Sequence, residues 1–477
     1  MLFNSLPFLF FFPAICLLHW MLPAKVRNGL LLVASYYFYM NWKPVYGCLI
    51  LLITLVSWGA AIYAGNGSRR KAIFAGGLTV CFGVLLLFKY AGFVSSSINE
   101  IFVTLRISMH IPVPDILLPV GISFYTFQAV GYLIDVYKGE IRPERSLIVY
   151  ALFISFFPQL VAGPIERASR LLPQFRAHRT FRIADLTEGI RLMLWGYFMK
   201  VVVADRLAVY VDSVYNNAAY HNGTSLILAT FFFSFQIYCD FGGYSAIAIG
   251  CAKAMGFELM NNFRRPYLAT SVTDFWRRWH ISLSTWFKDY LYIPLGGNRC
   301  NTGRNYINLM ATFIVSGIWH GANFTFMLWG ALNGAFQIAA KITAGIRSRA
   351  AANLFGKPSA LGKRVGRMAS IGFTFILISF AWVFFRANSI AESIIILRKI
   401  IFQPGPLFTN NIDSIIYGSL FVGILITSDI LQERNYGRHV MLENRRAWLR
   451  YASYVAICLI IIAFGVFDGS QFIYFQF

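Results

Sequence analysis

Long apolar stretches recur along the whole chain, and short polar segments rich in Lys and Arg separate them. Many of these stretches approach the ~20 residues that an α-helix needs to cross the hydrocarbon core of a bilayer. The alternation over ~10 residues that is typical of transmembrane strands is not visible. The pattern therefore predicts an all-α, polytopic membrane protein. Its candidate spans are residues 2–22, 28–42, 45–64, 72–94, 116–137, 147–163, 188–212, 224–240, 306–320, 323–343, 368–385, 412–432 and 451–467.

The Lys and Arg residues between the spans indicate an orientation, because cytoplasmic loops carry an excess of both. With the N-terminus outside, the basic segments 68–71 and 138–145 become cytoplasmic, and the C-terminus also lies outside. A full crossing by 147–163 would break this pattern, since it would place the arginine-rich segment 165–185 outside. We therefore expect 147–163 to be re-entrant, with its break marked by Pro158 and by the pair Gly163 and Pro164. Irregular backbone at membrane depth must be buried in protein or line a cavity, so this expectation implies a central cavity.

The composition of the 477 residues narrows the class of protein further. Charged residues make up 13% of the chain, against about 25% in average soluble domains. Cytoplasmic loops account for the net charge of +22, and no folded basic domain outside the spans points to nucleic acid. Those loops could also hold anionic lipid headgroups or a polyanionic cosubstrate. The seven cysteines form no Cys-x-x-Cys pair, so neither a disulfide framework nor a metal site is expected.

A basic and aromatic segment, 271–290, is predicted to form one amphipathic helix at the cytoplasmic interface. At about 100° per residue, its large apolar residues share one arc. They are Phe275, Trp276, Trp279, Leu283, Trp286 and Tyr290, and the charged residues Arg277, Arg278, Lys288 and Asp289 lie elsewhere. A membrane-surface anchor explains that pattern but does not require His280, which borders the aromatic arc. His280 is therefore a candidate functional residue, with anchoring of the helix as the alternative role for the segment.

A second histidine, His320, stands at the end of the apolar run 306–320. An ionisable side chain within a membrane span is by default a candidate functional residue. Gly317 and Gly321 beside it permit close approach of a substrate or a neighbouring helix. An imidazole with an ordinary pKa of about 6.5 can be neutral at cellular pH and accept a proton. The alternative is a structural interhelical hydrogen bond, typically worth ~0.6 kcal/mol in membranes.

Several runs of sequence, in order along nearly the whole chain, resemble the membrane-bound O-acyltransferase family. They are residues 118–128, 157–165, 236–245, 275–284, 289–299, 319–323 and 472–477. The resemblance is strongest to a bacterial branch that includes the alginate O-acetyltransferase membrane subunit and the teichoic-acid D-alanyl transfer protein. The chain departs from the family pattern at Ala246, where an Asp usually follows the Asp-Phe-x-Gly-Tyr-Ser run.

The resemblance implies a helical acyltransferase fold with re-entrant segments and a central cavity or tunnel. It implies one domain over 1–477, with a core near residues 115–345. The donor would be a cytoplasmic acyl thioester, for which acetyl-CoA is the expected form, with no permanently bound cofactor. The acceptor hydroxyl would belong to an exopolysaccharide, a cell-wall polymer or a periplasmic partner resembling SGNH hydrolases. The expected location is the bacterial cytoplasmic (inner) membrane.

The family's invariant catalytic histidine matches His320, and its second, more variable polar residue matches His280. On this hypothesis His320 is the general base toward the acceptor hydroxyl, while His280 positions or polarises the reacting groups. The residues predicted to bind the phosphates of the donor are Arg277, Arg278 and Lys288. Those predicted to line the cavity are Trp319, Asn323, Asp240 and Tyr244. The alternatives are a transporter or flippase with a histidine-lined path and, third, an export subunit without chemistry.

Overall fold

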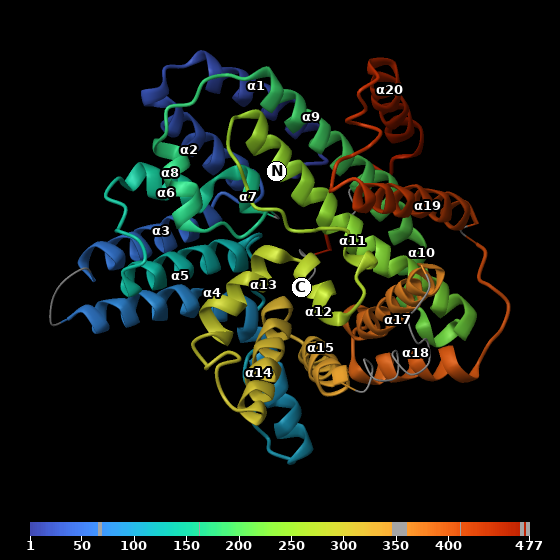
Figure 1. Ribbon diagram of the computed structural model, residues 1–477. Helices are drawn as coiled ribbons and strands as arrows, with labels where there is room; N and C mark the ends of the chain where they lie inside the picture. The colour runs from blue at the N-terminus through green and yellow to red at the C-terminus, as the bar shows by residue number, and fades with distance from the viewer. Residues whose placement is uncertain (65–68, 162, 346–359, 411, 468–471, 474–477) are drawn as a thin grey trace. The chain divides into compact units, whose positions relative to one another are not determined.

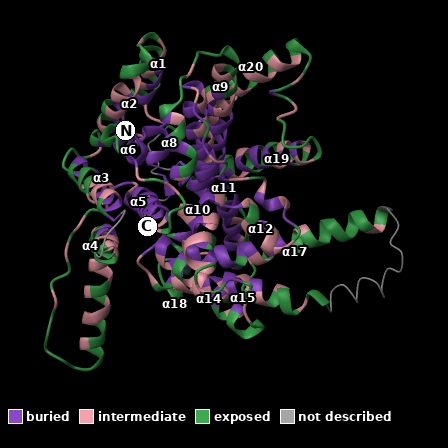
Figure 2. Ribbon diagram, turned by 60° about the vertical axis from the view of Figure 1, so that its left-hand side comes forward, coloured by how far each residue is buried: buried purple, intermediate pink, exposed green. Residues whose placement is uncertain are grey.

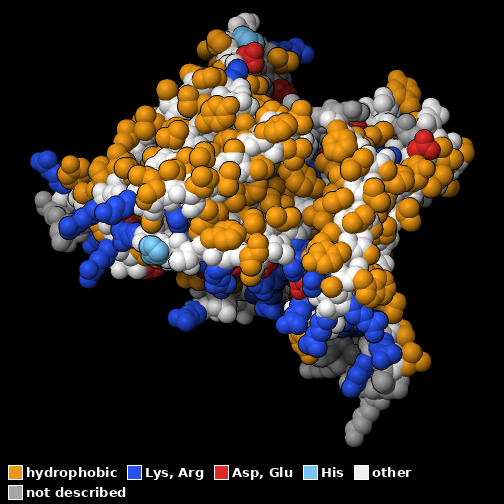
Figure 3. Space-filling model, turned by 90° about the horizontal axis from the view of Figure 1, so that it is seen from above, with side chains coloured by type: hydrophobic (Ala, Val, Ile, Leu, Met, Phe, Trp, Pro, Cys, Tyr) orange, Lys and Arg blue, Asp and Glu red, His pale blue; other side chains and the backbone are white. Residues whose placement is uncertain are grey.

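The computed structural model describes residues 1–64, 69–161, 163–345, 360–410, 412–467 and 472–473, and their regular structure is helical throughout (Figure 1). Six of the described helices are long and apolar enough to cross a membrane. They are α3 (Tyr46–Tyr63), α4 (Arg70–Thr104), α11 (Gly223–Ala254), α17 (Ala360–Arg386), α19 (Ile412–Arg434) and α20 (Ala447–Phe464). Hydrophobic side chains cover most of the face in Figure 3, with Lys and Arg gathered along parts of its margin. The prediction of an all-α, multi-pass membrane protein is confirmed.

The described chain divides into two compact units, of which the first comprises residues 1–196 and 244–260. Its helices, besides α3, α4 and the end of α11, are α1 (Leu6–Met21), α2 (Ala24–Met40), α5 (Ile122–Lys138), α6 (Leu147–Ser155), α7 (Phe157–Leu160), α8 (Ala168–Arg176) and α9 (Ile183–Tyr197). Helices α5 and α6 form much of its buried core (Figure 2). Tyr150 of α6 donates a hydrogen bond to the hydroxyl of Ser57 on α3 at 2.7 Å, which ties these helices together. The single-domain assignment stays a prediction.

The predicted span 147–163 is broken in the structure. Helix α6 ends at Ser155 and α7 begins at Phe157, because Phe156 between them has a non-helical ψ of 109°. Pro158 lies in the first turn of α7, where its missing N–H removes no helical hydrogen bond. The break near Pro158 is confirmed, whereas the re-entry of this segment and the central cavity stay predictions.

The second unit comprises residues 197–243 and the described residues from 261 to 473. Besides α17, α19, α20 and the first part of α11, its elements are η1 (Phe198–Ala204), α10 (Asp205–Tyr215), η2 (Ala218–Tyr220), η3 (Pro266–Leu268), α12 (Val272–Arg278), α13 (Ile281–Phe287), η4 (Lys288–Tyr292), α14 (Thr302–His320), α15 (Phe324–Ile342) and α18 (Ile390–Phe402). The π-helix η1 leads directly into α10. Helix α11 is longer than the predicted span 224–240 and is buried along most of its length (Figure 2).

The prediction of one continuous helix over 271–290 is wrong. The helix breaks between α12 and α13, where His280 has left-handed backbone angles, φ 41° and ψ 54°. Of the aromatic residues on the predicted arc, Phe275, Trp279 and Trp286 are buried, whereas Trp276 and Tyr290 are partly exposed and Lys288 is exposed. The hydrophobic period did not predict the break, since a single left-handed residue barely disturbs the period.

Helices α14 and α15 form a hairpin with His320 at its turn, where the predicted spans 306–320 and 323–343 meet. A Cβ on Gly317 would lie 2.2 Å from the carbonyl oxygen of Phe326, and one on Gly330 would lie 2.3 Å from that of Phe313. No side chain fits at such distances, so the two glycines let the helices pack backbone against backbone. This close packing fixes where the last residue of α14 lies.

Candidate active site

His280 is buried within the second unit, at the turn between α12 and α13, and is 1% exposed. Its left-handed backbone conformation is uncommon for residues other than glycine. Such a conformation costs of order 1–3 kcal/mol and persists only where the surrounding structure enforces it. The strain points to His280 as a candidate functional residue on structural grounds, apart from any resemblance to a family.

His320 is the last residue of α14 and is 3% exposed. The turn that follows it is held by Asn323, whose side-chain oxygen accepts a hydrogen bond from the backbone N–H of Thr325 at 2.9 Å. The side-chain amide of Asn323 donates to the carbonyl oxygen of Asn388 at 2.9 Å. Asn323 thus caps α15 and fixes the hairpin turn, and its predicted place in a cavity wall stays a prediction.

The structure brings the two candidate histidines together. Their ring centroids lie 6.4 Å apart, although the residues come from separate helical elements. Trp319 contacts both, with its ring centroid 6.0 Å from that of His280 and 5.0 Å from that of His320. One substrate could therefore meet both imidazoles. The predicted catalytic roles stay predictions, but the proximity that they require is present.

Aromatic rings surround the histidine pair. The ring of Phe241 packs edge-on against His280 at 4.6 Å, and Trp329 and Phe385 pack edge-on against His320 at 5.0 and 5.4 Å. These rings create surroundings of low polarity, where electrostatic interactions are stronger than in water. Burial lowers the pKa of His280 to about 3, so its imidazole is neutral at cellular pH. A neutral imidazole offers one N–H donor, and so low a pKa suits positioning or polarisation better than proton abstraction.

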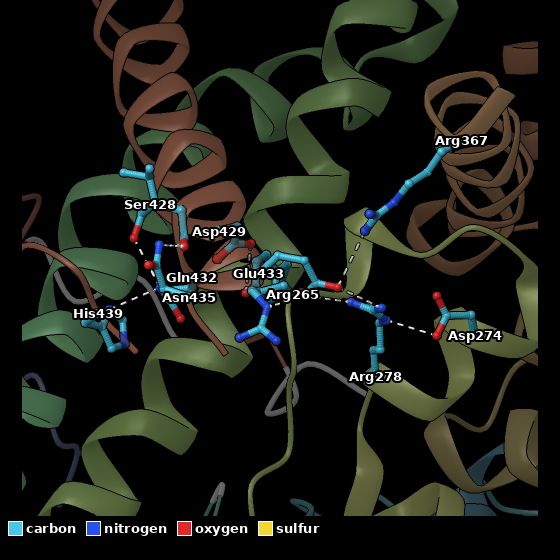
Figure 4. A network of polar contacts seen from close by, with 12 residues as sticks. Arg265, Asp274, Arg278, Arg367, Ser428, Asp429, Gln432, Glu433, Asn435 and His439 are labelled. Carbon is cyan, nitrogen blue, oxygen red and sulfur yellow. Dashed lines mark hydrogen bonds and ion pairs between the residues drawn. The ribbon is translucent and has the colours of Figure 1, made fainter. Parts of the chain in front are cut away.

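A charged network adjoins the His280 turn in the second unit (Figure 4). Glu433 of α19 accepts hydrogen bonds from Arg265 at 2.7 Å and from both terminal nitrogens of Arg278 at 3.1 and 3.2 Å. Arg278 also donates to Asp274 at 3.0 Å. Burial would lower the pKa of Arg278, but its bonds to Glu433 and Asp274 outweigh this and raise the pKa. Binding of donor phosphates by Arg278 stays a prediction, and a phosphate would have to compete with two carboxylates.

Three other predicted site residues are Arg277, Lys288 and Tyr244. Arg277 and Lys288 lie on the elements around the His280 turn, but their side chains are exposed. Tyr244 belongs to the first unit, where its hydroxyl donates a hydrogen bond to the side-chain oxygen of Asn4 at 3.0 Å. The roles predicted for these three residues stay predictions.

Asp240 is part of a buried ionic cluster. The ammonium nitrogen of Lys200 lies 2.6 Å from Asp240 and 2.7 Å from Asp205, and all three residues are at most 3% exposed. The second oxygen of Asp240 accepts a hydrogen bond from the backbone N–H of Ile473 at 2.7 Å. Two carboxylates compensate one buried cation, as a charge removed from water requires. The sequence did carry a signal for Lys200 and Asp205, because both stand inside the predicted span 188–212, where charges are rare.

Sequence reasoning also missed two residues that hold the His280 turn, Asn262 and Ser282. They lie 20 residues apart and bond through their side chains. No local pattern marks such a pair, because the contact depends on how the loop before η3 folds back onto α13.

Comparison with known proteins agrees with these observations. The sequence model of the membrane-bound O-acyltransferase family matches residues 141–363, a region that includes both histidines. A relative named "Probable alginate O-acetylase AlgI", from Pseudomonas aeruginosa, is 40% identical over 82% of this chain and 73% of its own length. A "Peptidoglycan O-acetyltransferase" from Helicobacter pylori is 32% identical over 100% of this chain and 98% of its own. A "Teichoic acid D-alanyltransferase" from Bacillus subtilis is 27% identical over 59% of this chain and 72% of its own.

Proposed function

The chain belongs to the membrane-bound O-acyltransferase family, and from that premise we propose that it passes an acetyl group across the membrane to a polysaccharide. The donor is a cytoplasmic thioester, acetyl-CoA, which is consumed as a cosubstrate. The observation that carries the proposal is the buried pair of His280 and His320, with ring centroids 6.4 Å apart in an aromatic environment. Two imidazoles at that separation can serve one reacting centre from two sides.

His320 acts as the general base. The acceptor oxygen attacks the thioester carbonyl carbon, so that a C–O bond forms and the C–S bond breaks. The hydroxyl proton passes to the imidazole of His320, which then gives it to the departing thiolate sulfur, and the histidine is regenerated. His280, neutral because of its burial, supplies an N–H that positions or polarises a reacting group. The aromatic residues around the pair limit hydrolysis by keeping water away.

The acceptor is a glycan hydroxyl, reached directly or through an external partner. Two relatives support this assignment by their printed names, which specify O-acetylation of alginate and of peptidoglycan, both of them polysaccharides. In the route through a partner, a periplasmic protein resembling SGNH hydrolases receives the acetyl group and completes the transfer to the glycan.

The enzyme lies in the bacterial cytoplasmic membrane, with both termini on the outer side. The distribution of Lys and Arg supports this orientation, since it leaves the arginine-rich segment 165–185 in the cytoplasm. A cysteine introduced at Ser169, labelled with a membrane-impermeant maleimide on intact cells, should stay unlabelled until the cells are opened. Labelling of intact cells would contradict the re-entrant interpretation of 147–163.

The proposed reaction is tested with purified protein in nanodiscs and acetyl-CoA labelled in the acetyl group. We expect release of free coenzyme A and transfer of the label to an added glycan or to a co-purified partner, both lost in His320→Asn. A transporter would instead move its substrate across the membrane of proteoliposomes without cleaving the thioester. Coenzyme A release that is equal in wild type and His320→Asn would contradict the proposed mechanism.

A further inference from the structure

His280 occupies the N-cap position of α13, but its side chain does not cap the helix. An N-cap residue usually offers a side-chain oxygen to the first backbone N–H groups of its helix, which have no partner within the helix. Ser, Thr, Asp and Asn serve this purpose, whereas the side chain of His280 makes no capping hydrogen bond. Another group must therefore satisfy the start of α13.

Asn262, from the loop before η3, supplies that group. Its backbone carbonyl accepts a hydrogen bond from the N–H of Ile281 at 2.9 Å, and its side-chain oxygen accepts one from the N–H of Ser282 at 3.3 Å. The same side-chain oxygen accepts the hydroxyl of Ser282 at 2.6 Å. Asn262 is 1% exposed and Ser282 is fully buried, so water does not compete for these bonds. One residue thus caps the first two positions of α13 from outside the helix.

A further backbone bond fixes the other side of the turn. The N–H of Arg264 donates to the carbonyl oxygen of Arg278 at 2.9 Å, so residues 262 and 264 hold the chain on both sides of His280. Left-handed backbone at a residue other than glycine needs such external constraint. Because Asn262 performs the capping, the side chain of His280 can point at Phe241 and Trp319 instead.

We infer that Asn262 is a positioning residue. It caps α13, which the side chain of His280 does not do, and thereby determines where the His280 imidazole lies. This inference rests on the proposed function for its kinetic consequence. Loss of its side-chain oxygen releases Ser282, relaxes the left-handed turn and moves the imidazole relative to His320.

The kinetic test compares Asn262→Ala with Asn262→Asp, which keeps an acceptor oxygen, and with Ser282→Ala, which removes only the hydroxyl donor. Misplacement of a catalytic group by about 1 Å can cost ~10²-fold, so we expect Asn262→Ala to lower kcat by about 10–100-fold with little change in the donor KM. Asn262→Asp should recover much of this rate, and Ser282→Ala should lie between the two. Thr285→Val is the matched control, because among the described residues the hydroxyl of Thr285 bonds the carbonyls of Ile281 and Ser282 in its own helix.

A double-mutant cycle separates positioning from general destabilisation. If Asn262 acts through His280, Asn262→Ala should add little to the loss already caused by His280→Asn. A full additional loss in the His280→Asn background, or wild-type kcat in both Asn262→Ala and Ser282→Ala, would overturn the inference.

A readout independent of acyl transfer keeps this inference distinguishable from the proposed function. Diethyl pyrocarbonate modifies accessible imidazoles, and mass spectrometry reports the modification of each histidine. Asn262→Ala should speed the modification of His280, which is 1% exposed in the native protein, while Thr285→Val leaves the rate unchanged. Faster modification without any thioester cleavage by the wild type would retain the positioning role and reject the proposed reaction. Unchanged modification of His280 in Asn262→Ala would overturn the inference, whatever the activity.

Discussion

The two histidines occupy turns that are built in different ways. The turn at His320 is built mainly from neighbouring residues, because Gly317 and Gly330 bring α14 and α15 into backbone contact and Asn323 caps α15 from within the turn. The turn at His280 depends on distant polar partners, since Asn262 caps α13 from the preceding loop. Backbone packing makes the turn at His320 sensitive to added side-chain volume, while the turn at His280 responds to the loss of single hydrogen-bonding atoms. Substitutions at the two turns should therefore affect stability and activity in different ways.

Substitution of the histidines themselves should give the largest difference. General-base catalysis is typically worth about 10²–10⁴-fold in rate, so His320→Asn should cut transfer by about that factor. Asn keeps a polar group of similar reach but accepts no proton near neutral pH, and expression and donor binding should stay close to wild type. His280→Asn should cost less, because a neutral, low-pKa imidazole contributes polarisation or positioning.

Single-turnover rates of coenzyme A release, measured beside equilibrium binding of the donor, check this order. Should His280→Asn abolish transfer while His320→Asn retains it, the two roles are exchanged. If both variants stay active, neither histidine is the base.

The local construction of the His320 turn predicts the second largest effect. Gly317→Ala would place a methyl group 2.2 Å from the carbonyl oxygen of Phe326, and overpacking of this kind typically costs about 1–3 kcal/mol. The helices must separate, so we expect a lower Tm in detergent together with slower transfer. Gly372→Ala in α17 is the matched control, because a Cβ there meets no atom within 4 Å. A Gly317→Ala protein with wild-type Tm and rate would contradict the packing argument.

These two turns also mark how far the sequence alone could predict the site. The apolar runs and the hairpin at His320 could be predicted, because span length and glycine spacing are local properties. The left-handed break at His280 could not be, since its cause is a hydrogen bond to Asn262, a residue that the chain meets well before α12. The ion pair of Lys200 with Asp240 was also missed, because its partners lie far apart in the sequence.

One element that was missed did have a local signal. The segment between the predicted spans 368–385 and 412–432 contains α18, which no predicted element covers. Ser389 caps this helix by accepting from the N–H of Glu392 at 3.1 Å, and Glu392 accepts in turn from the N–H of Asn388. This Ser-x-x-Glu capping box is readable from the sequence. The spans were predicted from hydrophobicity alone, and that criterion does not detect a capping box.

The loss of folding stability at low pH should depend on the buried His280 and not on an exposed histidine. Burial lowers its pKa from 6.5 to about 3, so between these values the unfolded chain binds a proton that the folded chain does not. Stability therefore rises with pH across this window and is lost as pH falls below about 6.5, by up to about 1.4 kcal/mol per pH unit. Thermal unfolding from neutral pH to about pH 5 should show a shallower loss of Tm in His280→Asn than in wild type. The exposed His178→Asn serves as control and should follow wild type, and equal pH slopes in all three proteins would reject a buried neutral His280.

The smallest expected effect concerns the basic residues that flank the His280 turn. Arg277 and Lys288 are exposed, whereas Arg278 is engaged by Glu433 and Asp274. Exposed charge contacts are typically worth about 0.2–1 kcal/mol, so Arg277→Gln with Lys288→Gln should raise the KM for acetyl-CoA about 2–10-fold with little change in kcat. Arg278→Gln should instead lower Tm and kcat, because it leaves two carboxylates without their shared partner beside the turn.

Steady-state kinetics at low and high salt checks both expectations, since only the KM effect should fade with salt. An unchanged KM in the double variant would assign both residues to membrane orientation alone, and a pure KM effect in Arg278→Gln would move the donor contact onto Arg278.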